Sequence, residues 1–256
     1  MENSHLNKIP AITLVFWIMK ISATTLGETG GDLIAQTMNV GYGTSSVILI
    51  GFFLAALTIQ FFTKKYHPAI YWLVIVATST AGTTMSDYMD RTLGVGYAAG
   101  SLILVGILLS ILVFWRFSVG SLSVENIKTF RVELLYWLAI LTSNTLGTAL
   151  GDYLADDSGL GFGGGAAVIT SLLVIVILLH YYSGISKVAL FWIAFVLTRP
   201  FGATFGDLLT KSAEAGGYDL GTIGASLILA VLLIAFVIYT SVQEYRVDTD
   251  FSIQDA

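Results

Sequence analysis

Thr25-Leu26-Gly27-Glu28-Thr29-Gly30-Gly31-Asp32 is a glycine-rich polar stretch that ends in a carboxylate and lies inside an apolar region. Versions of this stretch return three times, at residues 80–87, 145–152 and 200–207. Asp32 lies 55 residues before Asp87, and Asp152 lies 55 residues before Asp207. A tryptophan stands 15 residues before each of the four aspartates, at Trp17, Trp72, Trp137 and Trp192. The sequence therefore predicts four copies of one unit, grouped as two halves.

The composition identifies the class of protein. The chain has 256 residues, of which 55% are hydrophobic and 11% are charged, and its mean hydropathy is +0.82. Soluble domains carry roughly 25% charged residues, so this composition predicts a polytopic membrane protein. The chain has no cysteine, which excludes disulfides, thiolate metal sites and cysteine nucleophiles.

Apolar segments predict eight helices, each near the roughly 20 residues that cross a bilayer core. Their expected bounds are 10–36, 43–62, 69–90, 96–117, 131–155, 163–182, 187–212 and 221–241. The odd-numbered segments end in Thr, Ser, Gly and acidic residues, whereas the even-numbered ones are apolar throughout. We therefore predict an all-α integral membrane protein with eight transmembrane helices, in which odd helices lie inside and even helices face lipid. It would be one membrane domain over residues 1–256, with repeats at about 9–62, 69–117, 131–182 and 187–241 and a cytoplasmic tail at 242–256.

Each unit contains two helices, so all four units run through the membrane in the same direction, as parallel repeats. The four glycine-acid stretches must then share one side. The opposite side holds eight basic residues: Lys8, Lys64, Lys65, Arg116, Lys128, Arg131, Lys187 and Arg246. By the positive-inside rule both termini are expected to be cytoplasmic, in the inner (plasma) membrane. The four tryptophans would then form an anchoring belt near the cytoplasmic interface.

This combination resembles a bacterial family of uncharacterised membrane-anchored proteins. Its members are made of four tandem copies of a two-helix "repeat of unknown function", each bearing a tryptophan. The resemblance covers about residues 9–241 and rests on the four tryptophans and the four glycine-acid stretches. It implies the architecture and no activity.

Each stretch, placed on a helix, has two faces. One face carries pairs of small residues four positions apart, at Gly27/Gly31, Gly82/Ser86, Gly147/Gly151 and Gly202/Gly206. Such pairs let helices approach closely in lipid. The other face is a stripe of hydroxyl and carboxylate groups. We therefore expect the four odd helices to pack tightly around a polar centre.

The polar stripe predicts a site for a hard cation, which prefers oxygen ligands. The expected metal ligands are Glu28, Asp32, Asp87, Asp152 and Asp207, and the expected further oxygen donors are Thr25, Thr80 and Thr145. Glu28 stands out because the other units have Thr83, Thr148 and Ala203 at its position. A structural alternative is that the four aspartates are solvated helix ends at the outer interface.

Two basic residues lie at membrane depth without a basic counterpart in the other units, Lys20 and Arg199. Ionisable residues inside a membrane are usually functional, although a structural ion pair with Glu28 or with one of the aspartates is the other reading. Pro200 follows Arg199 and predicts a kink in the seventh helix.

Three functions compete. The leading expectation is a secondary transporter or exporter of a small ion, with a divalent metal cation as the preferred candidate, through a polar pathway between the odd helices. The second is an anion or organic-acid transporter that uses Lys20 and Arg199. The third is a structural or sensory membrane scaffold. No enzymatic motif, cofactor or nucleic-acid partner is expected; the expected partners are the lipid bilayer and a small ion or small-molecule substrate.

Overall fold

The structure is a computed structural model that describes residues 8–124, 127 and 129–254. Over these residues it is helical and contains no strand. The α-helices are α1 (Leu14–Asp32), α2 (Tyr42–Phe62), α3 (Pro68–Asp87), α4 (Tyr97–Val119), α5 (Phe130–Asp152), α6 (Gly161–Tyr182), α7 (Lys187–Thr210) and α8 (Gly221–Gln254). A five-residue π-helical turn follows each of the first three inner helices, at η2 (Leu33–Thr37), η3 (Tyr88–Thr92) and η5 (Tyr153–Asp157).

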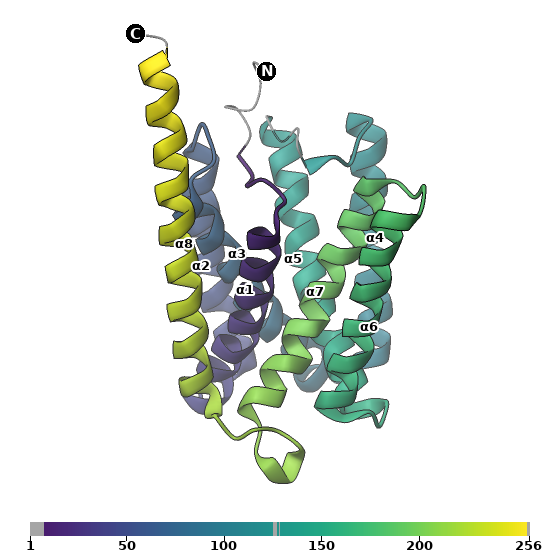
Figure 1. The fold of residues 1–256 in the computed structure, drawn as a ribbon. Helices are drawn as coiled ribbons and strands as arrows, with labels where there is room; N and C mark the ends of the chain where they lie inside the picture. The colour runs from purple at the N-terminus through teal and green to yellow at the C-terminus, as the bar shows by residue number, and fades with distance from the viewer. Residues whose placement is uncertain (1–7, 125–126, 128, 255–256) are drawn as a thin grey trace.

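The odd-numbered helices form a closed inner ring. Helix α1 packs against α3, α3 against α5, α5 against α7, and α7 against α1. Each outer helix packs against the inner helix of the following unit: α2 on α3, α4 on α5, α6 on α7, and α8 on α1. Both chain termini lie at one end of the bundle (Figure 1). The glycine-acid stretches are therefore gathered at the opposite end of the ring.

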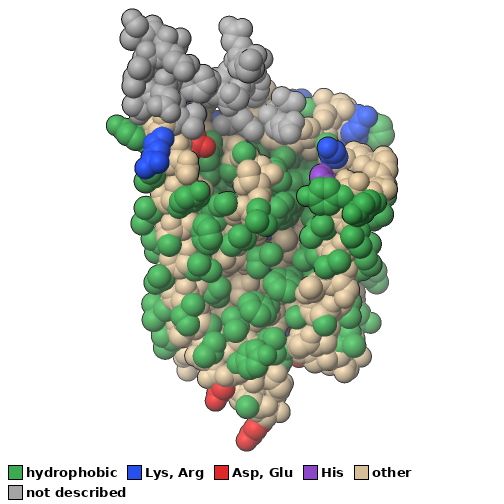
Figure 2. All heavy atoms as spheres, viewed as in Figure 1, with side chains coloured by type: hydrophobic (Ala, Val, Ile, Leu, Met, Phe, Trp, Pro, Cys, Tyr) green, Lys and Arg blue, Asp and Glu red, His purple; other side chains and the backbone are tan. Residues whose placement is uncertain are grey.

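Five helices are long and apolar enough to cross a membrane: α2, α4, α6, α7 and α8. The remaining inner helices α1, α3 and α5 carry the serine, threonine and charged residues that lower their hydropathy. Hydrophobic side chains cover the middle of the bundle surface, and the basic side chains visible on this face lie near the end that holds the termini (Figure 2). A surface of this kind is typical of a membrane protein.

Glycines set the close contacts around the inner ring. A Cβ atom added to Gly27 would lie 2.2 Å from Ser79 Cβ, and one added to Gly147 would lie 2.2 Å from Arg199 Cγ. In chain order the four contacts are Gly27 with Ser79, Gly82 with Asn144, Gly147 with Arg199, and Gly202 with Thr24. Each joins equivalent positions of consecutive units, so one helix–helix contact repeated four times closes the ring.

The prediction that the tryptophans form an anchoring belt is wrong for three of them. Trp72, Trp137 and Trp192 are buried in the bundle, and only Trp17 is half-buried. Each tryptophan ring contacts the aromatic residue that precedes the tryptophan of the neighbouring unit, with centroid distances of 5.7, 5.6, 6.4 and 5.8 Å. The pairs are Phe16–Trp72, Tyr71–Trp137, Tyr136–Trp192 and Phe191–Trp17. These eight side chains, which we call the aromatic ring, fill one end of the bundle because burial there removes more apolar surface from water than an interfacial position does.

The largest departure from the predicted helix bounds is at the C-terminal end of α8. Helix α8 continues to Gln254, beyond the predicted end at residue 241, because no glycine or proline interrupts this part of the chain. Helix α7 also continues through Pro200, and it ends at Thr210 without the π-helical turn of the other units. A longer loop follows instead: Gly221 lies 14 residues after Asp207, whereas the corresponding glycine lies nine residues after the aspartate in each of the other units, so this loop has five inserted residues.

Candidate functional site

A buried ion pair lies inside the inner ring. Arg199 and Glu28 are 0% and 3% exposed. The Nη1 and Nη2 atoms of Arg199 each donate to Glu28 Oε2 over 3.0 Å. Thr83 and Thr148 also donate to this oxygen, at 3.3 and 3.4 Å. The structure thus gives Glu28 and Arg199 the ion pair that the sequence offered as one of two readings.

The repeat explains why these side chains meet. Glu28, Thr83 and Thr148 occupy the same position in the first three units, four residues before the aspartate. In the fourth unit this position is Ala203, and Arg199 starts one turn earlier in α7 and extends to the other three. The absence of a side chain at Gly147 provides the room for the Arg199 stem.

Asp32 and Asp207 form a carboxylate pair that shares one lysine. Lys211 Nζ lies 2.9 Å from Asp32 Oδ2 and 3.1 Å from Asp207 Oδ1. Both carboxylates are buried, whereas the Lys211 side chain is 26% exposed. Asp207 Oδ1 accepts no well-aligned hydrogen bond from any described residue despite its contact with Lys211.

Asp87 and Asp152 form the second carboxylate pair, and it shares one arginine. Arg91 Nε lies 2.9 Å from Asp87 Oδ1, and Arg91 Nη2 lies 3.2 Å from Asp152 Oδ2. Nη2 also lies 3.7 Å from the exposed Asp156. The four aspartates are therefore divided between two cations.

Lys211 and Arg91 stay charged in these positions. Burial lowers the pKa of the Lys211 ammonium, but Asp207 and Asp32 outweigh burial and raise this pKa above its ordinary value. Burial likewise lowers the pKa of Arg91, and Asp87 and Asp152 raise it by more. Both side chains are therefore permanent cations at physiological pH.

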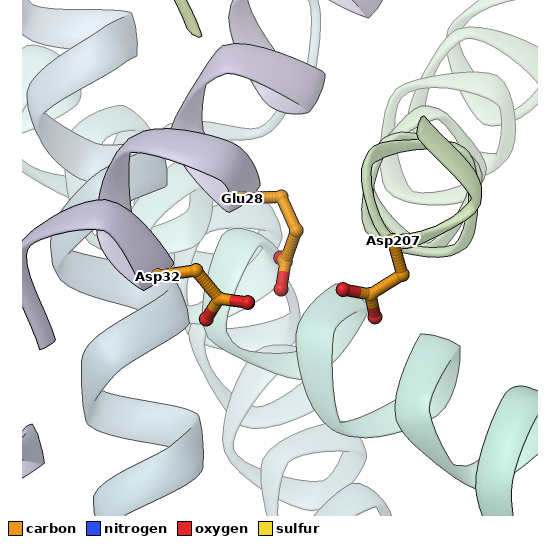
Figure 3. A group of neighbouring side chains, drawn as sticks. All are labelled: Glu28, Asp32 and Asp207. Atoms are coloured by element: carbon orange, nitrogen blue, oxygen red, sulfur yellow. The ribbon is translucent and has the colours of Figure 1, made fainter. Parts of the chain in front are cut away.

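Three carboxylates converge on one point. Glu28, Asp32 and Asp207 each offer an oxygen atom, and these atoms lie within 4.8 Å of one another. Their carboxyl groups, from α1 and α7, point toward one another (Figure 3). Opposite ligands around an ion with 2.3–2.6 Å bonds are about 5 Å apart, so the spacing fits a single calcium-sized cation. Of the five predicted metal ligands, the structure brings these three together.

Lys20 lies apart from every described carboxylate. Its side chain is fully buried, its Nζ lies 3.4 Å from Asn144 Oδ1, and it stands 4.2 Å from the centre of the Phe195 ring. Asn144 in turn donates to Thr78. Lys20 therefore belongs to a separate polar group between the ion pair and the aromatic ring.

The predicted threonine donors bond to their own helices. Thr25, Thr80 and Thr145 donate to backbone carbonyls three or four residues earlier. The threonines that contact the ion pair are Thr83 and Thr148, which the sequence reasoning passed over although they stand at the position of Glu28.

Lys211 and Arg91 were not predicted as partners of the aspartates. The available signal was their spacing. Each follows an aspartate by four residues, which is the separation of facing side chains on a helix.

Comparison with known proteins identifies the repeat. A family model described as a Repeat of Unknown Function (DUF347) matches the chain four times in tandem, at residues 15–66, 70–121, 135–186 and 190–245. Each matched stretch holds one inner helix and one outer helix. No curated protein and no solved structure matches the chain. The predicted four-repeat organisation of the sequence is confirmed.

Proposed function

The chain belongs to the family of Repeat of Unknown Function (DUF347) proteins, and from this premise we propose that it is a multi-pass membrane transporter of a small cation. A divalent metal ion is the preferred substrate, and Glu28, Asp32 and Asp207 are its ligands. The observation that carries the proposal is the convergence of these three buried carboxylates within 4.8 Å. Carboxylates at membrane depth usually mark an ion pathway.

The surface of the bundle supports a membrane location. Five helices have the length and hydropathy of membrane spans, and the outer faces are rich in exposed Leu, Ile, Val and Phe. The excess of basic residues at the end that holds the termini supports cytoplasmic termini in an inner membrane. The carboxylate pairs would then face the opposite, outer side.

The charge balance of the interior favours a cation over an anion. Five of the seven buried carboxylates among the described residues are Glu28 and the aspartates of the four glycine-acid stretches, and four basic side chains lie in the inner helices or at their ends: Lys20, Arg91, Arg199 and Lys211. When all are ionised one negative charge is left over, so an additional cation improves the balance. Arg199, which an anion would need, is already held by Glu28 and two threonines.

The aromatic ring supports access from one side at a time. Its rings close the end of the bundle opposite the carboxylate pairs, and Lys20 lies between the two regions. In this conformation a cation would approach the buried carboxylates from the outer side, past the partly exposed side chains of Lys211 and Arg91. Release to the other side requires the inner helices to separate at the aromatic ring, as in alternating access between repeats.

Reconstitution into liposomes tests the proposal. Purified protein is placed in vesicles that contain an indicator dye, and entry of Mn²⁺ or Ca²⁺ is followed in the wild type, in Asp32→Asn and in Asp207→Asn. We expect flux in the wild type and a loss of about tenfold or more in each variant, because each removes a charged ligand. Glu214→Gln, which changes an exposed carboxylate in the α7–α8 loop, is the matched control and should keep full flux.

Two results would exclude the proposal. Flux of Mn²⁺ and Ca²⁺ no higher than in empty vesicles would favour a structural or sensory scaffold. Flux of an anion that is lost in Lys20→Met and kept in Asp32→Asn would favour the anion transporter, for which the lack of a carboxylate partner of Lys20 among the described residues is the supporting observation.

A further inference from the structure

We propose that the two carboxylate pairs have different roles. In the Asp32–Asp207 pair the Lys211 ammonium occupies the position of the substrate cation and is displaced when that cation binds. In the Asp87–Asp152 pair Arg91 is a permanent occupant, and this pair is a structural replica that binds no ion. The inference rests on the proposed cation site. It assigns Lys211 as the gate of that site, and it predicts that one cation binds per chain.

The two pairs are related by the internal repeat. A shift of 120 residues converts Asp32, Asp87 and Arg91 into Asp152, Asp207 and Lys211. In both groups one basic side chain bridges two buried aspartates, at 2.9 and 3.1 Å for Lys211 and at 2.9 and 3.2 Å for Arg91. The same framework therefore holds two different cations, and the differences between them are informative.

Lysine and arginine differ in how easily they can be displaced. Lys211 presents a compact ammonium on a flexible stem, which can withdraw into water as a single unit. Arg91 presents a planar group that contacts three carboxylates at once, those of Asp87, Asp152 and Asp156. Displacing Arg91 would break all three of these contacts at once, so a free cation competes poorly with the Arg91 guanidinium for the carboxylates.

The backbone also distinguishes the two side chains. Arg91 lies within the π-helical turn η3, which continues α3. Lys211 instead follows the end of α7, with extended backbone angles (φ −71°, ψ 155°), and starts the inserted loop. The loop returns on itself, because Tyr218 N donates to Leu208 O and Asp219 N donates to Lys211 O. Lys211 therefore lies outside the inner helix, at the start of a loop that is five residues longer than in the other units.

The buried Glu28 carboxylate distinguishes the Asp32–Asp207 pair from the Asp87–Asp152 pair. Glu28 lies within 4.8 Å of both aspartates, whereas its equivalent after a shift of 120 residues is the uncharged Thr148. Asp207 Oδ1 and Asp87 Oδ1 are alike in this respect, because each is buried and contacts its bridging cation, at 3.1 and 2.9 Å, without a well-aligned hydrogen bond from any described residue. Glu28 therefore gives the Asp32–Asp207 pair a third oxygen ligand toward the six or more that a divalent cation takes.

Titration with Mn²⁺ tests the inference, because the electron paramagnetic resonance signal of free Mn²⁺ falls as the ion is bound. The wild type in detergent is compared with Lys211→Met and with the matched variant Arg91→Met. We expect one bound ion per chain in all three. Lys211→Met should bind about tenfold or more tightly than the wild type, since a competing charge at about 3 Å from the ligands has been removed. Arg91→Met should keep the wild-type affinity.

Additional variants and outcomes test whether Lys211 occupies the cation site. Adding Asp32→Asn to Lys211→Met should abolish the tight binding. Unchanged or weaker binding in Lys211→Met, or an equal gain in Arg91→Met, would overturn the inference even if Mn²⁺ flux into liposomes is observed. The predicted gain in affinity without any flux would instead uphold the gate and refute the transport function. Lys211→Gln, which keeps a polar side chain, distinguishes loss of charge from loss of folding.

Discussion

Replacing Glu28 by leucine tests the buried ion pair most directly. The change removes the oxygen that accepts both Arg199 donors and those of Thr83 and Thr148. It leaves the Arg199 guanidinium, which is 0% exposed and cannot lose its proton, without its nearest carboxylate. Breaking a buried pair in this way costs about 3–5 kcal/mol.

The reciprocal change should cost less. In Arg199→Leu the Glu28 carboxyl group keeps its hydrogen bonds from Thr83 and Thr148, so it is not left without a partner. The double variant Glu28→Leu/Arg199→Leu removes both charges and should recover most of the loss, since a buried pair is often no more stable than apolar residues of similar volume. The expected order of stability is wild type and double variant, then Arg199→Leu, then Glu28→Leu.

Thermal unfolding in detergent measures this order through the fluorescence of the five tryptophans. For a chain of this size 1 kcal/mol shifts Tm by about 2–4 °C, so Glu28→Leu should lower Tm by roughly 6–20 °C. Glu214→Gln, at an exposed position, serves as the control. A Tm of Glu28→Leu within about 2 °C of the wild type, or a double variant as unstable as the sum of its parts, would refute the reasoning.

Two further predictions concern packing and the isolated lysine. Gly27→Ala should destabilise the bundle by about 1–3 kcal/mol because the new Cβ would lie 2.2 Å from Ser79 Cβ. The control is Gly51→Ala on the outer helix α2, where a new Cβ would have no neighbouring side chain or helix within 4 Å. This variant should be neutral or slightly stabilising in the same unfolding assay. Lys20→Met should leave Tm unchanged or raise it, since the described partners of the fully buried Lys20 amine are the Asn144 side chain and the Phe195 ring, with no carboxylate among them. A fall of more than about 5 °C would show that the Lys20 side chain stabilises the fold.

Much of the architecture could be predicted because it follows from hydropathy and from the spacing of residues along the chain. Hydropathy gave the eight helices, and the recurrence of a tryptophan and an aspartate at fixed spacing gave the four units. The small-residue pairs indicated close helix contacts, and the glycines do make them. These features depend on local composition and spacing, which a sequence displays directly.

The orientation of the tryptophan rings could not be predicted from the sequence. Their depth along the helices could be counted, but whether an aromatic ring faces lipid or the bundle depends on the rotation of each helix against its neighbours. In the structure each tryptophan ring contacts an aromatic residue of another unit. The residue pattern within a single helix cannot predict such contacts between helices that are distant in the sequence.

The sequence by itself determined that Glu28, Lys20 and Arg199 are departures from the repeat and that each of the four glycine-acid stretches ends in an aspartate. Only the tertiary structure decided the partners: Arg199 with Glu28, Lys211 between Asp32 and Asp207, and Arg91 between Asp87 and Asp152. The physical reason is that a side chain pairs with what its length and direction can reach across the closed ring. That reach is fixed by the glycine contacts that set how near the helices come, and by the loop that carries Lys211 out of α7.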